Sequence, residues 1–196
     1  MSALAQVLQP DDLPANDELF GIIRERSFRR GRFTLSSGVE SDMYFNLKPT
    51  MMHPRGAYLC AAAFLKFIRA ESVDFVGGLE MGAVPIIGSL AAISEREGTS
   101  VATFFVRKRP KAHGTKDLIE GLGPEETLAK KRVLIADDVS TTGNSILIAV
   151  KAARDASAEV DAALVLVDRE EGARENLAQA GIRLIAIFRG RAFLAP

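Results

Sequence analysis

The chain has 196 residues, a length that fits one domain with a small appended subdomain. Hydrophobic residues make up 47% of it and charged residues 26%, which is ordinary for a soluble globular protein. Lysine plus arginine balance aspartate plus glutamate at 25 each, which argues against overall charge drawing the protein to nucleic acid or a membrane surface.

The number of cysteines and the hydropathy of the sequence indicate the cellular compartment of the protein. The one cysteine, Cys60, lies in an apolar run, so we expect a buried structural thiol in a reducing environment. The N-terminus lacks a basic segment followed by an apolar core, and no apolar run is long enough to cross a bilayer. We therefore expect a cytoplasmic protein with no membrane partner.

The N-terminal quarter predicts a helix and a hairpin. Residues 1–16 contain prolines and acids and indicate a loose leader or a short capping helix. A helix is predicted from about Glu18 to Phe28, ended by the basic cluster at 29–32. Two strands follow around a glycine turn, over 33–38 and 41–48, and together they predict a hairpin.

The next elements alternate between helix and strand. Apolar residues at helical spacing predict a helix over 55–71, and strands are predicted over 73–78 and 101–106. Between these strands, a loop over 79–85 opens a helix that runs to about Glu95. The glycines of this loop permit close approach of the backbone to a ligand.

A basic segment follows the strand that ends at Val106. Residues 107–116 contain five lysines and arginines and no acid. Glycines and a proline follow up to residue 124, so we expect the segment to be mobile until an anion neutralises its charge. A nucleic-acid patch or a solvated loop is the alternative interpretation.

Residues 133–146 combine features of a sugar-phosphate site. An apolar run predicts a strand buried on both faces, and it ends in Asp137 and Asp138. A loop of serine, threonine and glycine then enters a helix over about 142–156, whose N-terminal amides favour a phosphate. The carboxylates can accept hydrogen bonds from sugar hydroxyls or act on Mg²⁺. The alternative is two surface aspartates before a helix capped by Ser140 or Thr141.

The remaining pattern completes an α/β protein. A strand over 160–167, a helix over 173–180 and a strand over 182–188 continue the alternation. We predict a mostly parallel twisted sheet with helices on both faces and the loop-bearing strand ends at one edge. The expected division is a helix and hairpin hood over residues 1–50 and an α/β core over 51–196, with the basic loop at about 107–124.

Four motifs, in order from Phe33 to Gly172, carry a resemblance to a known family. Residues 133–146 resemble the phosphoribosyl-pyrophosphate (PRPP) motif of type I phosphoribosyltransferases. The hairpin pattern Phe-Thr-Leu-x-Ser-Gly-x-x-Ser-x-x-Tyr-Phe resembles the N-terminal hood of orotate phosphoribosyltransferases. The basic segment matches that family's Arg-Lys-x-x-Lys-x-His-Gly signature, and 168–172 resemble its Asp-Arg-x-x-Gly element.

The resemblance implies Mg²⁺-dependent transfer of the phosphoribosyl group from PRPP to orotate. The products would be orotidine 5'-monophosphate and pyrophosphate, a step of de novo pyrimidine synthesis. Lys111, His113, Asp137 and Asp138 are implied to be catalytic, and Mg²⁺ is carried by PRPP without a direct side-chain ligand. The residues implied to bind PRPP or its pyrophosphate are Arg107, Lys108, Lys111, His113, Asp137, Asp138, Val139, Ser140, Thr141, Thr142, Gly143, Asn144 and Ser145.

The orotate site is implied to consist of Tyr44, Phe45, Thr141 and Arg169, with the two aromatic rings against the pyrimidine. Alternatively, the two rings belong to the hairpin core, and Arg169 forms a surface ion pair with Glu170 or Glu171.

The resemblance also implies a homodimer in which the basic loop completes the neighbouring site, with no nucleic-acid partner. Two departures concern phosphate contacts: Ser36 replaces a lysine of some bacterial members, and Glu80-Met81 replaces a Tyr-Lys pair. The alternatives are transfer to another base, or a PRPP-sensing regulator that binds nucleic acid.

Overall fold

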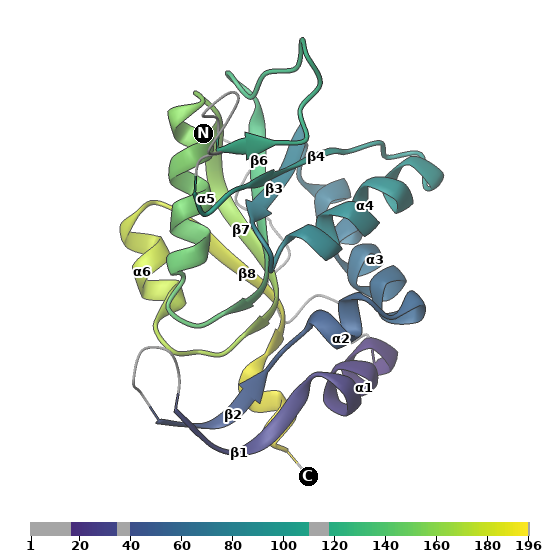
Figure 1. Cartoon of the computed structure of the whole chain (residues 1–196), viewed down its shortest axis with the longest axis vertical. Helices are drawn as coiled ribbons and strands as arrows, with labels where there is room; N and C mark the ends of the chain where they lie inside the picture. Colours follow the sequence, from purple (N-terminus) through teal and green to yellow (C-terminus); the bar gives the residue numbers. More distant parts are fainter. Residues whose placement is uncertain (1–16, 35–39, 110–117, 196) are drawn as a thin grey trace.

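A six-stranded sheet forms the centre of the protein in the computed structural model, which describes residues 17–34, 40–109 and 118–195 (Figure 1). The strand order is β5-β4-β3-β6-β7-β8, and all neighbours are parallel except β4 and β5. The predicted mostly parallel α/β sheet is confirmed. The strands are β3 (Phe75–Leu79), β4 (Ala102–Val106), β5 (Ile119–Glu120), β6 (Arg132–Ser140), β7 (Glu159–Asp168) and β8 (Arg183–Arg189).

Helices cover both faces of this sheet. On one side lie α3 (Pro54–Ala70) and α4 (Val84–Arg96), and on the other α5 (Asn144–Asp155) and α6 (Ala173–Gln179), as Figure 1 shows. In β6, Leu134 and Ala136 belong to the hydrophobic cluster of α3 and α4, whereas Val133 and Ile135 belong to that of α5 and α6. Burial on both faces explains why this strand is a continuous apolar run.

Two strands form a separate antiparallel sheet, β1 (Phe28–Thr34) with β2 (Glu40–Phe45). The prediction that Arg29, Arg30 and Arg32 end a helix is wrong, because α1 (Asp17–Arg26) stops before them and they lie in β1. The reason is tertiary: Phe28 is buried against the ring of Phe45, opposite it in the register, and this contact draws the chain into a strand.

The C-terminal 3₁₀ turn η3 (Gly190–Leu194) fastens this hairpin and α1 to the sheet. Phe193 is fully buried, with its ring centroid 5.7 Å from that of Phe28, 5.2 Å from Phe45 and 4.1 Å from Phe20 of α1. A buried phenylalanine of this kind contributes about 2–3 kcal/mol through removal of its surface from water. The short helix α2 (Lys48–Met51) then connects β2 to α3.

Most other predicted elements agree with the structure to within two residues at each end, but β2 ends three residues before the predicted strand end at 48, and α2, β5 and η3 were not predicted. Residues 1–16 and the hairpin turn at 35–39 lie outside the described residues. Within the described ranges, no helix is long and apolar enough to span a bilayer. The division into residues 1–50 and 51–196 stays a prediction.

Candidate active site

The loop between β3 and α4 packs directly against the acidic pair of β6. Asp137 and Asp138 lie near the carboxyl end of that strand, as predicted. A Cβ atom on Gly82 would lie 2.6 Å from Asp137 Oδ1 and 2.8 Å from Asp138 Oδ1. A larger residue at position 82 therefore forces either the loop or the carboxylates to move. The structure thus brings together the glycine-containing loop and the acids that the sequence placed at two separate strand ends.

Asp137 is almost fully buried, at 5% exposure, and its environment is unfavourable for a negative charge. Burial, followed by repulsion from the Asp138 carboxylate, raises the pKa of Asp137 well above its ordinary value of 3.8. The backbone amide of Asp138 donates to Asp137 Oδ1 at 3.0 Å and Lys48 adds a favourable charge, but they offset this only in part. A ligand that donates hydrogen bonds to Asp137 therefore favours the ionised form of this carboxyl.

The turn into α5 leaves helix-terminal amides available at the same sheet edge. Gly143 has φ +83°, and its Cα lies so close to Leu177 of α6 that a Cβ would be 3.1 Å from Leu177 Cγ. Asn176 of α6 donates to the Thr142 carbonyl at 2.9 Å and fixes the loop. The first amides of α5 have no carbonyl acceptor within the helix, so they suit an anion.

Ser140 has a different surrounding from the rest of the predicted phosphate loop. Its hydroxyl is buried and donates to Asp168 Oδ1 at 3.1 Å. Arg174 donates to the other oxygen of Asp168 at 2.8 Å. The Ser140 side chain is therefore engaged with the end of β7 and leaves the loop's remaining hydroxyls and amides for a ligand.

The start of the basic segment is held by Glu80 and Glu120. The Glu80 amide donates to the Val106 carbonyl and its carboxylate accepts from the Lys108 amide, both at 2.8 Å. Arg107 lies 3.7 Å from a carboxylate oxygen of Glu120, so its charge is partly neutralised within the chain. Three residues on which predictions rest lie outside the described ranges: Ser36, Lys111 and His113.

Tyr44 and Phe45 point to opposite faces of β2, as neighbours in a strand do. The ring of Phe45 is buried between Phe28 and Phe193, which supports the alternative assignment to the hydrophobic core. Tyr44 is 41% exposed, and its ring centroid lies 5.4 Å from that of Phe33. Of the two aromatic residues, Tyr44 alone presents a ring surface to a ligand or solvent.

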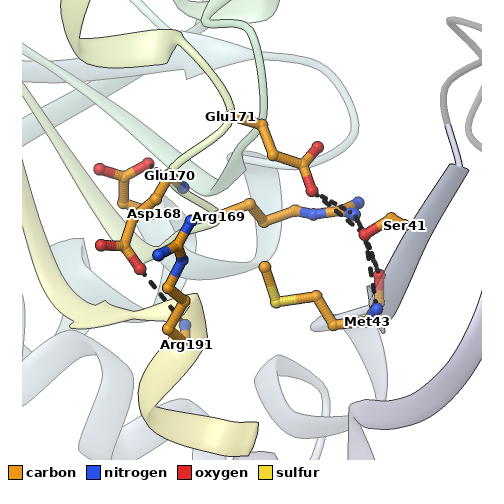
Figure 2. Close-up of polar contacts among 7 residues, drawn as sticks. All are labelled: Ser41, Met43, Asp168, Arg169, Glu170, Glu171 and Arg191. Carbon is orange, nitrogen blue, oxygen red and sulfur yellow. Dashed lines mark hydrogen bonds and ion pairs between the residues drawn. The ribbon is translucent and has the colours of Figure 1, made fainter.

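Arg169 follows β7 and reaches across to the hairpin (Figure 2). Its Nη2 donates to Ser41 Oγ at 2.8 Å, to the Met43 carbonyl at 3.0 Å and to Glu171 Oε1 at 2.9 Å. An ion pair with Glu171 was one of the predicted alternatives, but the arginine is buried, at 5% exposure, and does not lie on the surface. No local pattern predicts the contact of Arg169 with Ser41, because the two residues lie far apart in the chain.

Comparisons with known proteins agree with this geometry. The family model described as phosphoribosyl transferase domain matches residues 52–182. The orotate phosphoribosyltransferase of Bradyrhizobium sp. (strain BTAi1 / ATCC BAA-1182) is 53% identical over 176 residues, covering 90% of this chain and 95% of the relative.

Solved structures give the same result. The orotate phosphoribosyltransferase of Mycobacterium tuberculosis H37Rv in complex with Fe(III) dicitrate has a TM-score of 0.76 and 36% identity, covering 90% of this chain and 97% of the other. The structure of that enzyme in complex with PRPP has a TM-score of 0.73 and 32% identity, covering 91% and 98%. The acidic pair with its buried Asp137, the adjoining glycine loop and the open helix N-terminus thus occur in a chain that belongs to the orotate phosphoribosyltransferase family.

Proposed function

We propose that this protein transfers the phosphoribosyl group from PRPP to orotate, which yields orotidine 5'-monophosphate and pyrophosphate. The observation that carries the proposal is the packing of Gly82 against the carboxylates of Asp137 and Asp138, beside the N-terminus of α5. This arrangement offers acceptors for sugar hydroxyls next to donors for a phosphate. Relatives named for the orotate reaction and a neighbour structure with bound PRPP support the choice of substrates.

The acidic pair and the following loop bind the ribose 5-phosphate in this proposal. Asp137 and Asp138 accept hydrogen bonds from the ribose hydroxyls, and at the buried Asp137 these bonds favour the ionised form. The phosphate lies over the turn at Gly143, where backbone amides and the N-terminal end of the α5 dipole favour its charge. Ser140 acts through its backbone, because its hydroxyl donates to Asp168. The remaining loop residues assigned to PRPP are Val139, Thr141, Thr142, Asn144 and Ser145.

Mg²⁺ fits this site as an ion bound mainly by the substrate. Among residues 17–34, 40–109 and 118–195, no group of three or more His, Cys, Asp or Glu side chains is arranged to hold a metal ion. Asp137 and Asp138 remain as a pair of hard oxygen donors, suited to contact through ribose hydroxyls or water. When bound by PRPP, the ion neutralises charge on the departing pyrophosphate.

The pyrophosphate is bound on the other side of the acidic pair. Arg107 and Lys108 begin the basic segment beside Glu80, and we assign Lys111 and His113 to the same task from the family signature. The positive charge of these side chains opposes the negative charge that develops on the leaving group. By the same resemblance we propose a homodimer in which the segment completes the neighbouring site.

Orotate is assigned to the region where the hairpin contacts the loop after β7. Arg169 has a planar fork of donors for the carbonyl and carboxylate oxygens of this anion, and Thr141 adds a hydroxyl. Tyr44 supplies the exposed aromatic surface, and we assign Phe45 to the hydrophobic core.

The chemistry then depends mainly on positioning. The bond from the anomeric carbon to pyrophosphate breaks and a bond from an orotate ring nitrogen forms. The carbon acquires positive character as the pyrophosphate leaves, and the oxygens of Asp137 and Asp138 lie on the sugar side to stabilise it. Holding both substrates in one orientation supplies much of the rate enhancement.

Base-dependent pyrophosphate release from PRPP tests the proposal. We expect release that requires both orotate and Mg²⁺, with little turnover of adenine, hypoxanthine or uracil. Faster turnover of another base would assign the chain to that base instead. Binding to RNA or DNA that weakens steeply with salt, without base-dependent pyrophosphate release, would favour a regulator.

A further inference from the structure

We propose that Glu171 and Ser41 are positioning residues for Arg169, and that they set the affinity for orotate without touching PRPP. The inference deepens the proposed function and rests on it, because it assumes that Arg169 binds orotate. Its basis is a closed set of polar contacts that joins the end of β7 to strand β2 of the hairpin, shown in Figure 2.

The contacts converge on a single nitrogen of the guanidinium. Nη2 of Arg169 donates to Ser41, Met43 and Glu171, all within 3.0 Å. The Ser41 hydroxyl also lies 3.2 Å from Glu171 Oε1 and 3.2 Å from the Met43 carbonyl, and it can donate to either. Ser41 and Glu171 therefore restrain each other as well as the arginine.

The buried positive charge of Arg169 requires a negatively charged partner. Arg169 is 5% exposed, and a buried guanidinium without a counter-ion is strongly unfavourable. The Glu171 carboxylate supplies that counter-ion at 2.9 Å from Nη2. Without it, we expect the arginine to turn toward solvent or to bind a different acceptor, which would take it out of the orientation described above.

The rest of the guanidinium leaves a donor for a ligand. Nε of Arg169 is buried and has no hydrogen-bond partner among the described residues. Holding Nη2 against β2 fixes the plane of the group, so the direction of this unused donor is fixed as well. Since less than 1 Å² of Nε is exposed, an oxygen of orotate can accept from it only after the groups that cover it move, while the contacts of Nη2 keep the plane of the group fixed.

The neighbouring carboxylate, Glu170, provides a matched control. Its Oε2 accepts a hydrogen bond from the Arg191 amide at 3.3 Å and contacts the C-terminal turn, not the guanidinium (Figure 2). Glu170 and Glu171 thus have the same chemistry and adjacent positions, but different partners. An effect of nearby negative charge alone would appear in both variants, whereas a positioning effect appears only at Glu171.

Steady-state kinetics of Glu171→Ala, Glu171→Gln and Glu170→Ala test the proposal. A hydrogen bond to a charged group contributes about 1.5–3 kcal/mol, so Glu171→Ala should raise the KM for orotate at least about tenfold. The KM for PRPP should stay within about twofold of wild type. Glu171→Gln keeps an oxygen acceptor and should restore most of the orotate affinity, while Glu170→Ala should resemble wild type. Thermal unfolding of each variant checks that it is folded.

The kinetic results that would overturn the inference are as follows. If Glu171→Ala keeps the wild-type KM for orotate, or raises both KM values equally, the positioning role is wrong while the proposed function stands. If wild-type protein releases no pyrophosphate with orotate, the positioning role and the proposed function are both wrong. If Glu171→Ala does not fold, Ser41→Ala decides: a selective rise in the KM for orotate supports the proposal, and unchanged or equally raised KM values contradict it.

Discussion

Gly82 lies against Asp137 so closely that a single methyl group at position 82 would come within 2.6 Å of Oδ1. We predict that Gly82→Ala lowers kcat/KM for PRPP at least about tenfold, because the loop or the acidic pair must move by about 0.8 Å to reach ordinary contact at 3.4 Å. Gly88→Ala is the control, since a Cβ there meets nothing within 4 Å. Equal kinetics for the two variants would show that the close packing has no role in PRPP binding.

The buried charge of Asp137 is predicted to lower the free energy of unfolding, although the proposed function uses this carboxylate. Its pKa is raised, so between its ordinary value of 3.8 and the raised value the folded protein holds a proton that the unfolded chain has lost. The free energy of unfolding therefore falls as pH rises through this interval. Asp137→Asn removes the buried charge and should raise Tm by at least about 2 °C at neutral pH.

The same Asp137→Asn comparison has a built-in pH control. Below about pH 3.8 the carboxyl is protonated in both the folded and unfolded protein, so the difference in Tm between variant and wild type should shrink. A Tm difference that stays constant over the whole pH range would mean that the buried charge is not its cause.

Glu80 is predicted to hold the start of the basic segment. Glu80→Ala removes the acceptor of the Lys108 amide and should raise the KM for PRPP about threefold to tenfold, the loss of a hydrogen bond near 1 kcal/mol. Glu80→Gln keeps a side-chain oxygen and should stay near wild type. If both variants lower the KM for PRPP instead, repulsion between the Glu80 charge and pyrophosphate outweighs the hydrogen bond.

Phe193 is predicted to be the main fastening of the hairpin to the sheet. Phe193→Ala empties a fully buried position among four other rings and should reduce the free energy of unfolding by about 3–5 kcal/mol. Chemical denaturation measures this directly. Ile148→Ala, at an exposed site on α5, should change stability by less than about 0.5 kcal/mol, and a similar loss in both variants would contradict the assignment.

Much of the fold was predictable because local pattern and tertiary burial agree. The apolar run of β6 is buried on both faces, and the acids that follow it lie at the sheet edge where the pattern placed them. The start of β1 was missed because Phe28 packs against Phe45 of β2 and against Phe193 at the other end of the chain. The residues around Arg29, Arg30 and Arg32 show no pattern that predicts these long-range contacts.

The same limit applies within the site. Strand alternation separates Tyr44 from Phe45, but which ring is buried depends on the positions of Phe28 and Phe193 in the fold. Motif spacing indicated Arg169, whereas its contacts with Ser41 and Glu171 depend on how the hairpin lies on the end of β7. Lys48, whose charge acts on Asp137, also belongs to an element with no motif of its own.

The most direct test of the account is orotidine 5'-monophosphate formation at subsaturating PRPP, in wild-type protein and in Asp137→Asn. We predict that the wild-type protein forms orotidine 5'-monophosphate only when both orotate and Mg²⁺ are present. In the variant, the loss of charged acceptors for the ribose hydroxyls should lower kcat/KM for PRPP at least about tenfold. No product from wild type, or full efficiency in the folded variant, would contradict the central claim that this acidic strand end binds the sugar.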